Sequence, residues 1–251
     1  MCELLPNDSS DDDVARFRYG WNDELRRKAE RKEGPSHKER MREISVDRIL
    51  VELRESNLSS FRYLGWGMHA TDAELELVLD SVESLTESAQ LICLLRIFSR
   101  RALPRMDSRI TDLCVYPDRD VQRTAYRALA NNSHPTIRQF AIDQIREGEP
   151  YAIPLLRKNY APGDERAILN SINLTGNLNE THWTLSDIIK VLEDNPSAEG
   201  LQLGIIAYAS TPCGICRSAA AKLLIEQGTA PQWLVEECRF DSGNDNSKDD
   251  T

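Results

Sequence analysis

The chain has 251 residues, of which 40% are hydrophobic and 29% charged, so it can enclose a core beneath a strongly hydrated surface. Its formal net charge of −10 disfavours a duplex nucleic-acid partner, because phosphate contacts require a basic surface. No segment reaches the roughly 20 apolar residues of a membrane-spanning helix, and the first residues lack the basic and apolar regions of a secretory signal.

The predicted elements begin after an acidic segment. Residues 1–12 are polar and acidic, which predicts disorder, and apolar residues at helical spacing predict an N-terminal helix over 13–33. From 36 to 240 we expect a succession of short helices joined by short connections, followed by a disordered tail over 241–251. No window alternates apolar and polar residues for long enough to predict a strand.

Several helix boundaries are predicted from capping residues. Thr71-x-x-Glu74 has the pattern of a capping box, and Asp118 precedes a run of apolar residues at helical spacing. Between 150 and 180 the pattern is less regular and predicts two shorter helices, and Gly228 marks a helix end. The other predicted starts are Asp107, Ser133 followed by Pro135, Thr184-x-x-Asp187, Ser197, Thr211-Pro212 and Pro231.

A short phrase recurs at the start of several predicted helices: an apolar residue, usually an Arg, two further residues and a small residue. The small residue lies one turn after the apolar one, so both share a face and a neighbouring helix can approach closely. Short connections then place consecutive helices antiparallel and side by side. The four occurrences are Phe61-Arg62-x-x-Gly65, Val121-Gln122-x-x-Ala125, Ile137-Arg138-x-x-Ala141 and Cys216-Arg217-x-x-Ala220.

These residues resemble HEAT-like helical repeats. The resemblance is strongest over 107–147, where Asp118-x-x-Val121-x-x-x-Ala125 and Pro135-x-Ile137-Arg138-x-x-Ala141 are similar to the start of HEAT inner helices, and it extends more loosely from 45 to 240. Gln122 stands where the family usually has Arg. The occurrences are also unevenly spaced, whereas a regular array repeats about every 40 to 47 residues. The resemblance implies an all-α fold, an irregular right-handed α-solenoid of antiparallel helix pairs.

The resemblance also implies a function. The concave face of such a stack usually binds another protein or peptide, so we expect a non-enzymatic scaffold or adaptor with a protein partner and no cofactor. Some relatives are enzymes or enzyme subunits, and DNA glycosylase-like and bilin lyase-like activities are the alternatives. The sequence carries no phosphate-binding loop, nucleophile elbow, paired catalytic carboxylates or metal-binding pair of histidines, so we assign no catalytic residue. The oligomeric state stays open.

Two segments supply candidate binding residues. Arg96, Arg100 and Arg101 belong to the densest basic patch of the predicted repeat region. They follow an apolar helix, so they either complement its dipole or bind an anionic ligand. Arg62 and Trp66 lie in an aromatic segment that either fills the seam between two repeats or contacts a ligand.

The cysteines give a second kind of candidate. Six cysteines, three of them in helical apolar surroundings, are typical of reduced thiols in a cytoplasmic protein. Cys213 and Cys216 form a C-x-x-C at a predicted helix start, where a thiolate is stabilised, so the pair is a candidate redox switch or metal site. Cys216 also occupies the apolar position of the recurring phrase, which favours a packing role. Cys238, on the next predicted helix, is a candidate third ligand.

Overall fold

The computed structural model describes residues 36–55, 60–174, 177–196 and 199–239. Residues 1–45 and residues 46–251 form two compact units. Within the described residues every regular element is helical and none is a strand, which confirms the all-α class. The segments 1–12 and 241–251, predicted to be disordered, and the helix predicted over 13–33 lie outside the described residues.

One described helix belongs to the first unit. This helix, α2 (His37–Arg42), begins after Ser36, whose hydroxyl accepts the N–H of Glu39, while the Glu39 carboxylate accepts the N–H of Ser36. This reciprocal pair satisfies two backbone donors that a helix start leaves open.

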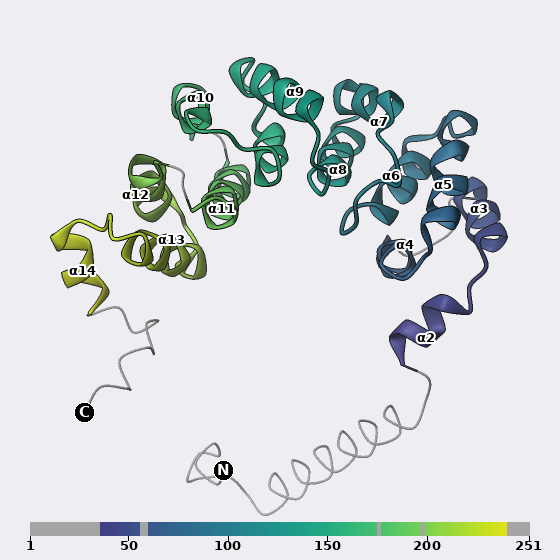
Figure 1. Ribbon diagram of the computed structural model, residues 1–251, viewed down its shortest axis with the longest axis horizontal. Coiled ribbons are helices and arrows are strands. Elements are labelled where there is room, and N and C mark those ends of the chain that lie inside the picture. Colours follow the sequence, from purple (N-terminus) through teal and green to yellow (C-terminus); the bar gives the residue numbers. More distant parts are fainter. Residues whose placement is uncertain (1–35, 56–59, 175–176, 197–198, 240–251) are drawn as a thin grey trace, which may run out of the picture. The chain divides into compact units, whose positions relative to one another are not determined.

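The second unit contains the remaining described helices (Figure 1). Most are α-helices of 5 to 17 residues, and three short elements, labelled η, are 3₁₀-helices. In chain order they are α3 (Val46–Glu55), α4 (Ser60–Gly67), α5 (Asp72–Asp80), η1 (Ser81–Ser84), α6 (Ser88–Ile97), α7 (Ser108–Asp112), η2 (Leu113–Val115), α8 (Arg119–Leu129), α9 (Pro135–Arg146), η3 (Pro150–Arg157), α10 (Asp164–Ser171), α11 (Leu178–Asp194), α12 (Leu201–Ser210), α13 (Gly214–Glu226) and α14 (Gln232–Cys238).

Four of the eight predicted helix starts are confirmed, those at Thr71, Asp107, Asp118 and Pro231. Thr71 and Glu74 form the capping box of α5. Asp107 and Asp118 accept backbone N–H groups at the starts of α7 and α8. Pro231 precedes α14, and Gly228 ends α13 in the left-handed region at φ 66°, which favours glycine.

Two predicted starts are displaced. Thr184 and Asp187 lie in the middle of α11, which begins after Asn177, because a capping-box pattern also matches polar residues inside a long helix. His134, rather than Ser133, caps α9: its Nδ1 accepts the N–H of Thr136, and the Ser133 hydroxyl instead donates to the carbonyl of Lys158.

Two further differences involve neighbouring segments. Cys213 is the residue before α13, and Thr211 is the residue that ends α12. The first of the two short helices between 150 and 180 is the 3₁₀-helix η3, in which Pro150 and Pro154 lack backbone donors. Ser197 lies outside the described residues.

The helices of the second unit pack mainly against elements that are close in chain order. One continuous series of contacts runs from α4 through α6, α8, η3 and α11 to α13. A second series links α9, α10 and α12, and α9 and α12 also contact η3, α11 and α13 of the first series. The second unit therefore contains two parallel series of helices that contact each other (Figure 1).

The small residues of the recurring phrase lie in these contacts. Ala125, Ala141 and Ala220 have no exposed surface, and Gly65 is buried. Gly67 shows how close the helices approach, because a Cβ atom at this position would lie 2.0 Å from the carbonyl oxygen of Ile97 on α6. The small residues of the phrase are therefore buried, as the sequence predicts, and Gly67, two residues after Gly65, marks a close approach of α4 and α6.

Candidate functional site

Within the predicted basic patch, Arg101 is paired inside the fold, as is the neighbouring Arg105. Arg101 donates to the carbonyl of Ala70 and forms an ion pair with Asp72 at the start of α5, at 2.6 Å. Arg105 pairs with Asp80 at the end of the same helix. Arg96 lies in the last turn of α6, and Arg100 is exposed beyond it. Arg101 and Arg105 thus hold the segment after α6 against α5.

The second predicted binding segment contributes to the core. The indole of Trp66 is 1% exposed, and Tyr63 beside it is fully buried. Arg62 forms an ion pair with Glu52 of α3 at 3.2 Å. The aromatic segment therefore fills the contact between α4 and its neighbours, which is the packing alternative considered from the sequence. The side chain of Phe61 lies outside the part of the chain that the structure describes.

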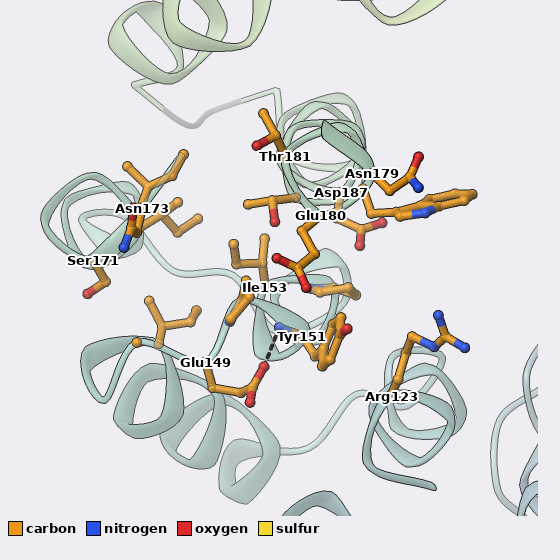
Figure 2. A pocket seen from close by; sticks show the side chains of 18 of the residues that line it. Arg123, Glu149, Tyr151, Ile153, Ser171, Asn173, Asn179, Glu180, Thr181 and Asp187 are labelled. Carbon is orange, nitrogen blue, oxygen red and sulfur yellow. Dashed lines mark hydrogen bonds between the residues drawn. The ribbon is translucent and has the colours of Figure 1, made fainter. Parts of the chain in front are cut away.

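A pocket of about 750 Å³ lies between α8, η3 and α11, with the end of α10 at one edge (Figure 2). Tyr151 and Ile153 of η3 form its floor, and the Glu149 carboxylate accepts the N–H of Tyr151 at 3.0 Å. Figure 2 shows Glu180 and Thr181 approaching from α11 and Arg123 from α8. The pocket is lined by both charged and apolar groups.

Three arginines of α8 form one wall of this pocket. Arg119, Arg123 and Arg127 are spaced four residues apart, which places them on one face of the helix. Arg119 pairs with Glu149 at 2.5 Å and lies over the ring of Tyr151 at 4.8 Å from the centroid. These contacts hold Arg119 against η3, while the partly exposed Arg123 pairs with Asp120 of its own helix at 2.7 Å and Arg127 is exposed.

The opposite wall belongs to α11. Trp183 is 48% exposed, and the guanidinium of Arg127 lies 5.9 Å from the centroid of its ring. Asp187, one turn further along α11, forms an ion pair with Lys190 at 3.3 Å. Burial raises the pKa of Asp187, and the nearby positive charges offset this effect only in part. An exposed aromatic ring of α11 and an arginine of α8 therefore meet at the pocket.

A cluster of possible metal ligands forms on the side of α11 that contacts α13. The ligand atoms of His182, Cys213 and Cys216 all lie within 4.8 Å of one another, and Nδ1 of His182 is 3.7 Å from Sγ of Cys216. The backbone N–H groups of Cys216 and Ile215 lower the pKa of Cys213, whereas burial raises the pKa of Cys216. The two thiols of one motif thus have different environments.

The other described cysteines, Cys93, Cys114 and Cys238, are buried. Cys238 lies on α14, and His182 rather than Cys238 is the third member of the cluster. Cys93 and Cys114 are enclosed in the core, and burial raises the pKa of each thiol. Cys216 is buried, as the recurring phrase predicts, and its thiol still contacts the imidazole of His182.

Two features of the site were not predicted from the sequence. The arginine stripe of α8 carries a visible signal, since Arg119, Arg123 and Arg127 recur every four residues on a predicted helix. His182 carries none, because it lies 34 residues from Cys216 and belongs to no spacing pattern of metal ligands.

No helix within the described ranges combines the length and apolar character needed to cross a bilayer. No protein family, curated protein or solved structure was found to match this chain.

Proposed function

We propose that the second unit is an irregular, right-handed HEAT-like α-solenoid and that it works as a non-enzymatic binding module. Its ligand is a short segment of another protein, bound in the pocket between α8, η3 and α11. Support for the solenoid comes from the two series of helix contacts, in which each element packs against near neighbours in the chain. The proposed binding face is the one carried by the series from α4 to α13.

The observation that carries the binding proposal is the exposed ring of Trp183 opposite the arginines of α8. Partly exposed Trp and Arg residues are enriched among the anchors of protein interfaces, because each combines a large contact area with hydrogen-bonding groups. Asn177 and Asn179 add carboxamides at the start of α11, of which the Asn177 oxygen already caps the helix. Carboxamides and guanidiniums can bind the backbone and side chains of a peptide.

The charge of the lining favours a peptide over a nucleic acid. Three arginines line the pocket together with three carboxylates, those of Glu149, Glu180 and Asp187. A phosphate backbone would meet these carboxylates as well as the arginines, within a chain of net charge −10. A peptide carrying both acidic and polar groups matches both kinds of lining residue.

Two of the three pocket carboxylates also have structural partners, which favours binding over catalysis. Glu149 caps η3 and pairs with Arg119, and Asp187 pairs with Lys190. The proposal does not extend to a bilin lyase, since that alternative requires an apolar groove at Trp66, and this side chain is buried.

Site-specific photo-crosslinking tests the proposal. A photoreactive phenylalanine analogue replaces Trp183 in one protein and Trp233 of α14 in another; the two rings are 48% and 47% exposed. After irradiation in cells of the source organism, we expect a defined protein adduct from position 183, with the attached peptide identified by mass spectrometry. Equal adducts from both positions, or none from 183, would contradict the proposal.

Charge reversal gives the second test with the same partner. We expect Arg123→Glu to weaken binding of the crosslinked peptide by about 10-fold or more, because an interface arginine commonly contributes about 1 to 2 kcal/mol of binding free energy. Arg146→Glu, an exposed arginine of α9 outside this pocket, is the matched control. Binding that responds equally to the two changes reports only the net charge of the protein.

A further inference from the structure

We propose that His182, Cys213 and Cys216 form a binding site for one thiophilic transition-metal ion, and that Zn²⁺ is the ion whose preferences they match. The site joins the middle of the second unit to its C-terminal helices. It is independent of the peptide-binding proposal, because its residues lie on the α13 side of α11 and none of them lines the pocket.

The two cysteines are brought together by the start of α13. Cys213 is the residue before the helix, and Cys216 is the third residue inside it. A side chain in the first of these positions turns back over the first helical turn, so it meets the side chain three residues later. The backbone of Arg217 closes this turn with a hydrogen bond to the carbonyl of Cys213, at 2.9 Å.

The third donor comes from a different helix. His182 lies in the first half of α11, which packs against α13. Its Nδ1 is 3.7 Å from Sγ of Cys216. In a tetrahedral zinc site, Zn–S distances of about 2.3 Å and Zn–N distances of about 2.0–2.1 Å place N and S about 3.6 Å apart. The structure therefore already holds this pair of atoms at the separation that a shared zinc ion requires.

The groups around the ligands support the same reading. The backbone N–H of Thr211 donates to the carbonyl of Ala207 at 3.2 Å, at the end of α12. Thr211 is 3% exposed, and its hydroxyl also accepts the N–H of Cys213 at 3.3 Å. Outer hydrogen bonds of this kind orient metal ligands and increase metal affinity. The backbone at Cys213 is thereby held in place before any ion binds.

Three protein ligands leave one tetrahedral position for a further group. Cys213 is partly exposed, and Ile215 between the two cysteines is 83% exposed, so the site faces solvent. A set of two thiolates, one imidazole and an accessible fourth position suits Zn²⁺ better than Mg²⁺ or Ca²⁺, which prefer oxygen ligands. The converging imidazole also separates this site from a simple dithiol, which needs no third donor.

Zinc binding to the full-length, reduced protein tests the proposal. We expect equilibrium dialysis to give one tightly bound Zn²⁺ per chain. Substitution by Co²⁺ should then give visible absorption of a tetrahedral ion together with thiolate-to-metal charge transfer in the near ultraviolet. His182→Ala and Cys213→Ser should each lower the affinity by at least about 100-fold, since loss of an outer partner alone costs 10- to 100-fold.

Matched controls separate this site from other thiols and histidines. Cys238→Ser and His134→Ala should retain zinc binding, because neither residue belongs to the cluster. Circular dichroism in the presence of a chelator shows whether each variant remains helical. The proposal is overturned if His182→Ala binds zinc as tightly as the unchanged protein, if Cys238→Ser loses the ion, or if the reduced protein binds none.

Trp183 provides a readout that a merely structural change would not move. Its ring centroid lies 5.1 Å from that of His182, whereas Trp233 belongs to α14, a helix that carries none of the three proposed ligands. Bound Co²⁺ should therefore quench the fluorescence of Trp183, and the quenching should disappear in Trp183→Phe but persist in Trp233→Phe. Quenching that persists in Trp183→Phe and disappears in Trp233→Phe would place the ion elsewhere and contradict the proposal.

Discussion

Arg138 of α9 donates two hydrogen bonds to the carboxylate of Asp164, from Nε at 3.0 Å and from Nη2 at 2.6 Å. Asp164 begins α10 and is 4% exposed, and it also accepts the N–H of Ala161 at 2.8 Å. The ion pair thus fixes the start of α10 to α9.

Replacing Arg138 by Met should lower the free energy of unfolding by about 1–3 kcal/mol, because it leaves a buried carboxylate without its cation. Arg123→Met is the control: both arginine side chains are 39% exposed, but the carboxylate partner of Arg123, Asp120, is 66% exposed. The control should cost about 0.5 kcal/mol or less. Urea denaturation of both variants measures the difference, and equal losses would show that the burial of Asp164 does not matter.

Removing the hydroxyl group should affect stability differently at two buried tyrosines. Tyr63 and Tyr126 are both buried, but the Tyr126 hydroxyl donates to Gln144 at 2.9 Å, whereas that of Tyr63 has no hydrogen-bond partner among the described residues. Tyr126→Phe should therefore cost about 1 kcal/mol of stability, and Tyr63→Phe should be neutral or stabilising. Thermal unfolding compares the two; a larger loss for Tyr63→Phe would reveal a partner for its hydroxyl.

Close helix packing makes Gly67 intolerant of a methyl group. Because the added Cβ would lie 2.0 Å from a backbone oxygen of Ile97, Gly67→Ala should lower stability by about 1–3 kcal/mol. At Gly214 an added Cβ meets no heavy atom within 4 Å, so Gly214→Ala should cause no loss. Both are measured with a chelator present, so that metal binding does not contribute. Tolerance of alanine at both sites would refute the close approach of α4 and α6.

Two aspartates should affect the pH dependence of stability with opposite signs. Burial raises the pKa of Asp187 above its unfolded value of about 3.9, so its protonated form favours the folded state. This favourable contribution is lost as the pH rises through the folded pKa, where the partly buried carboxylate ionises. Asp187→Asn should therefore increase stability at neutral pH and flatten the decline above about pH 4.

Asp107 behaves in the reverse way. Its hydrogen bonds from Arg109 lower its pKa, so its contribution to stability is present above the unfolded value of about 3.9 and is lost as the pH falls through the folded pKa. Asp107→Asn should thus destabilise the protein at neutral pH, with the effect shrinking in acid. Denaturation curves between about pH 3 and 8 test both aspartates, and parallel profiles would contradict the assignment.

Local chemistry explains which parts of the fold could be predicted from the sequence. The caps at Thr71, Asp107 and Asp118 depend on hydrogen bonds to the next two or three residues, so the sequence around them is sufficient. The start predicted at Thr184 failed because the same local pattern occurs inside α11, whose start is capped by Asn177.

The candidate sites depend on contacts between distant segments, which a single sequence does not show. Cys213 and Cys216 were identifiable because their spacing and a helix start are local features. His182 joins them only through the packing of α11 on α13, so no pattern in the chain indicates it. Arg62 and Trp66 were proposed from composition, and burial then decided that Trp66 belongs to the core.

The succession of contacts from α4 to α13 also has a kinetic consequence. Since most partners are separated by one or two elements in the chain, few long loops must close before native interactions form. Such a molecule can fold or unfold stepwise from either end. An ion shared by α11 and α13 would therefore oppose local unfolding that starts at α14, before it reaches the middle of the chain.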